Sequence, residues 1–555
     1  MTIKSLIFLL FISSTCISYP PTFLDEYPCK SSTESSYETK LPQAIDHFYG
    51  SLKSIIKNLQ NNLYFIPQII IDQFLPADTH KDELATVRFS EEDEICRAEN
   101  NFIANRSPVI QEAVERLTHK KLPDGKVPKI GLCFSGGGFR AMILTLGFLQ
   151  AAQEIGLLDA TMYMTGLSGS TWAIAPWIAS KKDLSTYINE LSSKISSGLD
   201  HIDDPNELAH LMRIILSKLL TNQFISAMDI YGAVLANTLL KDLGSRRFHA
   251  TMSETHEYLN NGELPLPIYT AVATMEGPYE WMEFTPYEVG NLSCKSYIPL
   301  WSYGRKFREC QSANIKYEQT LGYYMGIFGS AFEVNIEDIL HRTTYNMTTI
   351  LSYLPSFLQE PVEDTIKLLL DSPVGSLRLF PSILPNFTFG CSQDTLFKDV
   401  KKLCLIDAGI DYNLPLPPLL RAARNLDIIV IYDGSSTING AHELRLAEKY
   451  AREHNLKFPE INFSEILENP VSVFQDENDP SVPIIVYFQR VTNHQYSSSF
   501  NPDLCVEEGY CNTFNFVYSH ANIAELSGLA NFTLTEHQEV IASVLADVIE
   551  KKYSA

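Results

Sequence analysis

Lys129-Ile-Gly-Leu-Cys-Phe-Ser-Gly-Gly-Gly-Phe-Arg140 and Thr161-Met-Tyr-Met-Thr-Gly-Leu-Ser-Gly-Ser170 are the two stretches that decide the fold of this chain. Each begins as a short apolar run, which is typical of a buried strand, and each ends among glycines. The residues between them, Arg140–Glu154, have a helical pattern that stops at Gly156. Strand, helix and strand within about 35 residues predict a βαβ unit with parallel strands and a right-handed crossover.

The same alternation continues along the rest of the chain. Further strand candidates are Ile268–Thr274, Leu403–Ile406, Ile428–Tyr432 and Ile484–Phe488. Apolar runs that alternate with helical segments predict an α/β fold.

Ser168 is the candidate nucleophile. It lies in Gly166-Leu-Ser168-Gly-Ser170, between a predicted strand and an apolar, helix-compatible stretch. We interpret this as a turn of the G-x-S-x-G type, in which glycines beside the serine relieve crowding and the strained turn exposes the hydroxyl. A helix start directly after the serine favours developing negative charge. The other interpretation is a serine that only caps the helix.

The glycine run Ser135-Gly-Gly-Gly138 follows the preceding strand. Consecutive glycines let backbone N–H groups converge on an oxyanion without a side chain in the way. Gly136-x-Gly138-x-x-Ala141 also fits a loose dinucleotide fingerprint, which would need an acidic residue at the end of the second strand. That strand ends instead at Thr165, directly before the serine turn, which argues against the dinucleotide interpretation.

Two charged residues flank these motifs. Arg140 opens the helix after the glycines, where its guanidinium could grip a substrate phosphate, add positive charge near the oxyanion or form a structural ion pair. Asp407 ends the strand Leu403–Ile406, and its carboxylate could take the proton of Ser168 directly. Asp433, at the end of the next strand, is the competing acid, and an ordinary turn aspartate is the plain alternative.

Composition excludes some functions and predicts a compartment. The formal net charge of −23 disfavours nucleic-acid binding and simple attraction to anionic lipid headgroups. Lys4 followed by the apolar run from Leu6 to Ile12 predicts a signal peptide at residues 1–18, and hence a secreted or exported protein. Six N-x-S/T sequons would then suggest a glycoprotein, and Cys505 and Cys511 are the best disulfide candidates. No cysteine or histidine cluster has metal spacing, and no cofactor is expected.

Several blocks together resemble the catalytic domain of cytosolic phospholipase A(2), which is related to fungal lysophospholipases (phospholipase B) and more distantly to patatins. These blocks, in order, are Ser135-Gly-Gly-Gly-Phe-Arg-Ala-Met142, Gly166-Leu-Ser-Gly-Ser-Thr-Trp172, Glu283-Phe-Thr-Pro-Tyr-Glu-Val-Gly290, Gly329-Ser-Ala-Phe332, Asn413-Leu-Pro415 and Thr513-Phe-Asn-Phe516. The resemblance covers roughly residues 95–550.

The resemblance implies a mixed, largely parallel central sheet flanked by helices, and a Ser168–Asp407 dyad with no catalytic histidine. It also implies Gly137 and Gly138 as oxyanion donors, Arg140 as a cation on the phosphate side, and a phospholipid or lysophospholipid substrate at a membrane or micelle surface. We expect a signal peptide at 1–18 in place of the family's calcium-dependent lipid-targeting module, an N-terminal helical extension at 19–94, and the catalytic domain at 95–555. The apolar stretch Ile350–Phe387 is a candidate lid or interfacial patch, or core.

Two alternatives remain open at this stage. A Ser-His-Asp esterase of the α/β-hydrolase type would need a late histidine, with His442, His494, His520 and His537 as candidates. A catalytically silent lipid-binding protein would keep the fold without the reaction.

Overall fold

The computed structural model describes residues 80–553, apart from residues 81, 91–92, 200–213, 215–226, 275–278, 315, 331–381, 393–395, 437–439, 465 and 467–468. The predicted signal peptide, residues 19–79 of the predicted N-terminal helical extension and residues 350–381 of the candidate lid lie outside this described part.

Strands and helices alternate through most of the described chain. The strands are β1 (Arg88–Phe89), β2 (Ile130–Phe134), β3 (Tyr163–Gly166), β4 (Leu266–Thr274), β5 (Glu280–Phe284), β6 (Glu288–Asn291), β7 (Ser296–Pro299), β8 (Phe307–Arg308), β9 (Gln311–Ser312), β10 (Ser382–Pro385), β11 (Lys402–Asp407), β12 (Ile428–Asp433), β13 (Val471–Phe474) and β14 (Ile484–Gln489). The α-helices are α4 (Arg97–Thr118), α5 (Gly138–Ile155), α6 (Leu157–Ala160), α7 (Gly169–Ser180), α8 (Leu184–Ile195), α10 (Ala227–Leu239), α11 (His256–Leu259), α12 (Leu321–Phe328), α16 (His442–Glu453), α17 (Pro502–Glu507), α18 (His520–Glu536) and α19 (Gln538–Val548).

A mixed sheet forms the centre of the fold. Its main path runs β1-β7-β6-β5-β4-β3-β2-β12-β14-β13, with β11 paired to β4 and β10 paired to β11. The pairings of β4, β3, β2, β12 and β14 along this path are parallel, and those toward both ends are antiparallel. The predicted βαβ unit is confirmed as β2-α5-β3, and the four later strand candidates are confirmed as β4, β11, β12 and β14.

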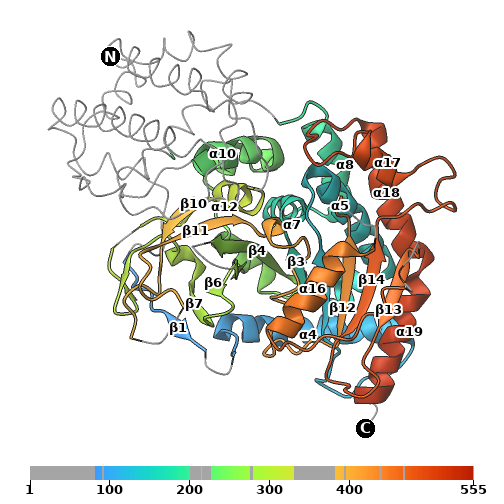
Figure 1. Ribbon diagram of the computed structural model, residues 1–555, viewed down its shortest axis with the longest axis horizontal. Helices are drawn as coiled ribbons and strands as arrows, with labels where there is room; N and C mark the ends of the chain where they lie inside the picture. Colours follow the sequence, from blue (N-terminus) through green and yellow to red (C-terminus); the bar gives the residue numbers. More distant parts are fainter. Residues whose placement is uncertain are drawn as a thin grey trace.

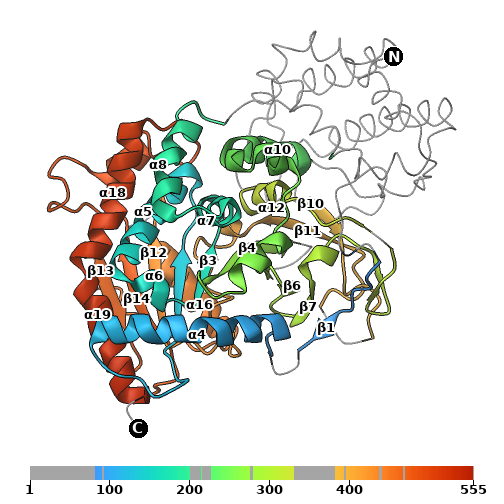
Figure 2. The ribbon, with the colours of Figure 1, turned by 180° about the vertical axis from the view of Figure 1, so that it is seen from behind.

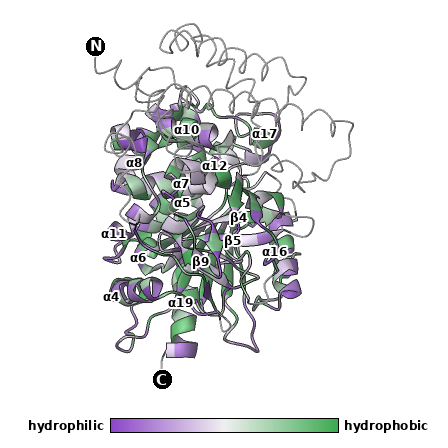
Figure 3. Ribbon diagram, turned by 90° about the vertical axis from the view of Figure 1, so that its left-hand side faces the viewer, coloured by the Kyte–Doolittle hydropathy of each residue, from purple (hydrophilic) through white to green (hydrophobic). Residues whose placement is uncertain are grey.

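Helices cover both faces of this sheet. α16 lies in front of the strands in Figure 1, and α4 and α6 lie in front of them when the molecule is seen from behind in Figure 2. Hydrophilic residues gather on the outer sides of α4 and α16, while hydrophobic ones concentrate toward the sheet (Figure 3). Such one-sided patterning is expected of helices that cover a sheet. No helix in the described ranges is both long enough and apolar enough to cross a bilayer.

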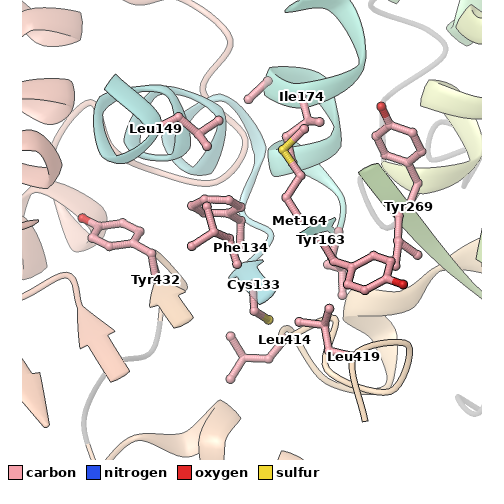
Figure 4. Close-up of a cluster of buried hydrophobic side chains, with 14 of the residues drawn as sticks. Cys133, Phe134, Leu149, Tyr163, Met164, Ile174, Tyr269, Leu414, Leu419 and Tyr432 are labelled. Carbon is pink, nitrogen blue, oxygen red and sulfur yellow. The ribbon is translucent and has the colours of Figure 1, made fainter. Parts of the chain in front are cut away.

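The core on both sides of β2 and β3 follows the two-residue period of a strand. Figure 4 shows Phe134 and Met164 directed to the face of the sheet on which Leu149 of α5 lies, whereas their neighbours Cys133 and Tyr163 point away from it. All five side chains are at most 1% exposed. Both faces of these strands are therefore buried, as expected for the parallel centre of an α/β sheet.

The N-terminal and candidate-lid segments contribute strands where they are described. β1 pairs with β7 and so extends the sheet at one end. Residues 382–385 of the candidate lid form β10, which pairs with β11, and Phe387 is buried. This last part of the apolar stretch is therefore core.

Candidate active site

Ser168 occupies the sharp turn between β3 and α7. Its backbone has φ 50° and ψ −120°, a conformation that a residue with a side chain rarely adopts. Holding such a conformation costs on the order of 1–3 kcal/mol, which the surrounding structure must offset. The strained serine between a parallel strand and a helix has the geometry of a nucleophile elbow, as the sequence predicted.

The turn departs from a strict G-x-S-x-G in one respect. Ser170 stands where the second glycine would be, and the glycine directly after Ser168 is Gly169. The Ser170 hydroxyl accepts a hydrogen bond from the backbone N–H of Leu167 at 2.8 Å and donates one to the carbonyl of Phe134 at 2.9 Å. Ser170 therefore ties the serine turn to the end of β2.

The glycine run lies against this turn. Gly137 and Gly138 have φ values of 131° and 63°, which favour glycine, and α5 begins at Gly138. A Cβ placed on Gly169 would lie 2.0 Å from the carbonyl oxygen of Gly138, and one on Gly136 would lie 2.8 Å from Cβ of Ser168. The starts of α5 and α7 are thus in backbone contact, with the glycine run beside Ser168.

Sheet topology brings Asp407 to the same place. β5 pairs with β4 from Tyr269 to Ala273, so it occupies one edge of β4 throughout that range. β3 ends with Gly166 opposite Tyr269, and β11 ends with Asp407 opposite Ala271. Both strands must therefore share the other edge of β4, where their ends meet head to head.

Asp407 is fully buried at this junction. Its Oδ1 accepts a hydrogen bond from the N–H of Gly409 at 2.9 Å, and its own N–H donates to the hydroxyl of Ser330 at 3.0 Å. Burial raises the pKa of the Tyr231 phenol, and the Asp407 carboxylate raises that pKa further. α10, which carries Tyr231, therefore places a buried aromatic residue within the electrostatic reach of Asp407.

Arg140 is buried beneath the glycine run. Its Nε donates to the carbonyl of Gly434 at 3.0 Å, and one terminal nitrogen donates to the carbonyl of Cys511 at 2.8 Å and to the hydroxyl of Thr513 at 2.9 Å. The other terminal nitrogen lies 2.2 Å from where a Cβ on Gly137 would be.

The two carbonyls and the hydroxyl that accept from Arg140 are neutral groups. Burial, with a smaller contribution from the like charge of Arg490, lowers the pKa of Arg140 to about 9. The guanidinium is therefore a desolvated positive charge directly beside the glycine run. The structural ion pair that was its plain alternative is absent among the described residues.

The disulfide between Cys505 and Cys511 is confirmed. It closes the turn that presents the Cys511 carbonyl to Arg140. A second disulfide, Cys310–Cys391, joins residues 81 positions apart, and no local sequence pattern predicted that pairing.

The competing candidates lie elsewhere or are already engaged. Both carboxylate oxygens of Asp433 accept hydrogen bonds, from the N–H of Ser435 at 3.0 Å and from the hydroxyl of Tyr487 at 2.8 Å. The imidazole of His520 contacts the hydroxyl of Ser192 at 2.7 Å, and that of His537 contacts the carbonyl of Thr533. Within the described part of the chain, none of the four candidate histidines is hydrogen-bonded to Ser168.

Two polar residues near the site were given no role by the sequence. Asn413 donates from Nδ2 to the carbonyl of Gly136 and to the hydroxyl of Ser435. The signal for Asn413 was its place in Asn413-Leu-Pro415, whereas Ser435 stood in no motif. In the described ranges, no group of three or more His, Cys, Asp or Glu side chains is arranged to hold a metal ion.

A family model and the curated relatives of this chain agree on one family of proteins. The model of the lysophospholipase catalytic domain matches residues 130–466. Cytosolic phospholipase A2 delta of Mus musculus is 27% identical over 534 residues, and the zeta enzyme of the same species is 26% identical over 546 residues. Each alignment covers 83% of this chain, but only 63% and 62% of the respective relatives. This chain therefore spans less than two thirds of their length.

Solved structures agree on the fold. Human GIVD cytosolic phospholipase A2 superposes with a TM-score of 0.70 at 23% identity, covering 84% of this chain and 66% of that one. The same human protein in complex with methyl gamma-linolenyl fluorophosphonate gives a TM-score of 0.66, also at 23% identity, with the same coverage. The predicted α/β fold, a mixed and largely parallel sheet flanked by helices, is confirmed.

The prediction of a secreted or exported protein is wrong. The relatives that the chain matches are named as cytosolic enzymes, which contradicts it. A short apolar run after one lysine is not unique to secretory signals, because buried helices contain such runs as well. The predicted glycoprotein is likewise unsupported, and two of its sequon asparagines, Asn291 and Asn386, are buried and out of reach of a glycan.

The matched region covers more than half of the sequence and contains the glycine run, the serine turn and the strand that ends at Asp407. The chain belongs to the lysophospholipase catalytic-domain family, to which the cytosolic phospholipases A2 are related.

Proposed function

We propose that this protein hydrolyses fatty-acyl esters of glycerophospholipids or lysophospholipids, with Ser168 as nucleophile and Asp407 as its base. The observation that carries the proposal is the meeting of a strained serine and a buried aspartate on one edge of β4, beside a glycine run. The names of the relatives supply the substrate class.

The proposed reaction has two steps. Ser168 Oγ attacks the ester carbonyl while its proton passes to the Asp407 carboxylate and then to the departing alcohol oxygen, which leaves an acyl-enzyme. Water then attacks the acyl carbon and loses its proton to Asp407, and the fatty acid leaves as Ser168 regains a proton. No histidine is required, because the carboxylate serves as acceptor and donor in turn.

Backbone amides would stabilise the oxyanion of each step. The N–H groups of Gly137 and Gly138 stand at the start of α5, and α7 begins one residue after Ser168. Two helix N-termini therefore direct their positive ends toward the ester oxygen.

We propose that the positive charge of Arg140 stabilises this oxyanion and does not bind a distant lipid headgroup. Its side chain is fully buried, and it donates three hydrogen bonds to neutral acceptors. Its remaining terminal nitrogen lies beside Gly137. A desolvated guanidinium at that position favours negative charge on the neighbouring oxyanion.

Two measurements test the proposal together. The first is labelling of Ser168 by a fluorophosphonate, the class of inhibitor bound by the solved relative. The second is product analysis with phosphatidylcholine and lysophosphatidylcholine labelled at defined acyl positions. We expect labelling that vanishes in Ser168→Ala, and release of free fatty acid from at least one lipid. A wild-type protein that is neither labelled nor active would instead be a silent lipid-binding member of the family.

A further inference from the structure

We propose that Asn413 is a positioning residue that fixes the glycine run relative to the loop of Asp407, an inference that rests on the function proposed above. Asn413 lies in the loop after β11, six positions beyond Asp407. Its side chain contacts both the glycine run and the turn that follows Asp407, although it belongs to neither the serine turn nor the glycine run.

The contacts with the glycine run are made in both directions. Asn413 Nδ2 donates to the carbonyl of Gly136 at 3.1 Å, and the N–H of Gly136 faces the Asn413 carbonyl at 3.4 Å. The same Nδ2 donates to the hydroxyl of Ser435 at 2.7 Å. Ser435 is itself held by its N–H bond to Asp433 at the end of β12. The amide group therefore ties Gly136 to a neighbouring strand of the sheet.

The oxygen of the same amide lies on the side of Asp407. A Cβ placed on Gly409 would be 3.1 Å from Asn413 Oδ1 and 3.2 Å from Asp407 Oδ1. The N–H of Gly409 donates to Asp407 Oδ1, so this short turn orients the carboxylate. Asn413 packs against that turn and against Gly136 at once.

An amide is needed at this position for a chemical reason. The glycine run has no side chain between Ser135 and Phe139, and two of its residues have positive φ, so external bonds must hold its amides in place. The Gly136 carbonyl can only accept, so its partner must donate. A carboxylate of the same shape would place oxygen against that carbonyl and lose both N–H bonds.

The test compares Asn413→Asp with a matched variant, Asn386→Asp. Asn386 also donates from Nδ2 to two acceptors, the carbonyls of Phe397 and Val400, but it lies after β10 and outside the proposed machinery. Both variants therefore lose two donors and gain a carboxylate. We expect Asn413→Asp to lower kcat by about 10- to 100-fold with KM within about threefold, because misplaced oxyanion donors act on the transition state.

We expect Asn386→Asp to lower the melting temperature without a matching loss of kcat per folded molecule. A pH series adds a readout that a purely structural role would not move. Protonation of the new carboxyl restores one donor, so the activity of Asn413→Asp relative to wild type should rise as pH falls toward about 4. Equal kcat losses in the two variants, or a relative activity that does not change with pH, would overturn the role of Asn413.

Failure of the proposed function can be told apart from failure of this inference. If the wild type shows neither turnover nor fluorophosphonate labelling, the hydrolase proposal fails. Amide hydrogen exchange at Gly136–Gly138 then decides the structural part. Faster exchange in Asn413→Asp, but not in Asn386→Asp, supports the positioning contact, whereas unchanged exchange refutes it.

Discussion

Gly169→Ala tests whether the contact between the serine turn and the glycine run sets the rate. The new Cβ would stand 2.0 Å from the carbonyl oxygen of Gly138 and 2.8 Å from its nitrogen and carbonyl carbon, all of which are backbone atoms. Relief to an ordinary 3.4 Å contact requires the two segments to separate by about 1.4 Å, and a misplacement of this size can cost on the order of 100-fold in rate.

A second glycine provides the control. A Cβ on Gly147 would lie 2.1 Å from the backbone carbonyl of Ser527, where α5 packs against α18, so Gly147→Ala creates a clash of the same size elsewhere. Both variants should lose about 1–3 kcal/mol of unfolding free energy, the usual cost of overpacking. The assay is hydrolysis of lysophosphatidylcholine and the rate of fluorophosphonate labelling, each per folded molecule. A Gly169→Ala enzyme within threefold of wild type, or an equal loss in Gly147→Ala, would refute the reasoning.

Three further predictions follow from the site and its support. Asp407→Asn should lower turnover by about 1,000-fold or more, the scale of losing a dyad member, whereas Asp433→Asn should stay within about tenfold; steady-state kinetics of both variants would reassign the base if the order reversed. His520→Ala should keep wild-type turnover, because its imidazole contacts Ser192, and a large loss in the same assay would revive the triad. The pKa of Glu99 is lowered below its usual value, since the charge of Arg424 and its hydrogen bonds outweigh the opposing effect of burial. Its stabilisation is thus complete above pH ~4.5 and disappears as pH falls through the lowered pKa, so Glu99→Gln should cost about 3–5 kcal/mol at pH 7 and flatten the acid limb of a urea-unfolding series.

The centre of the fold could be predicted because its signals are local. β2, α5 and β3 follow from apolar runs that end at glycines, and Ser168 follows from the turn between them. Asp407 was recognised as the end of a strand, but its approach to Ser168 depends on β11 replacing β3 along β4, a pairing between distant segments. No pattern within one segment encodes that arrangement.

Other features had no local signal or a misleading one. The sequence left three roles open for Arg140: binding a phosphate, stabilising an oxyanion or forming an ion pair. Its hydrogen-bond acceptors in the structure come from residues more than 290 positions later in the chain. The antiparallel strands β5, β6 and β7 are short and contain charged or polar residues, so they lacked the apolar runs that revealed the parallel strands. The N-terminal apolar run was assigned to export on a pattern shared with other kinds of segment.

The hydrogen bonds that Arg140 donates to Cys511 and Thr513 have a consequence for biosynthesis. The Cys511 carbonyl and the Thr513 hydroxyl lie 371 and 373 positions after that arginine, so a growing polypeptide carries the serine turn long before it carries these acceptors. Until the ribosome has released them, the guanidinium lacks two of the bonds that set its place. If Ser168 acts as proposed, catalytic competence would then arise only after residues 511–513 have been synthesised.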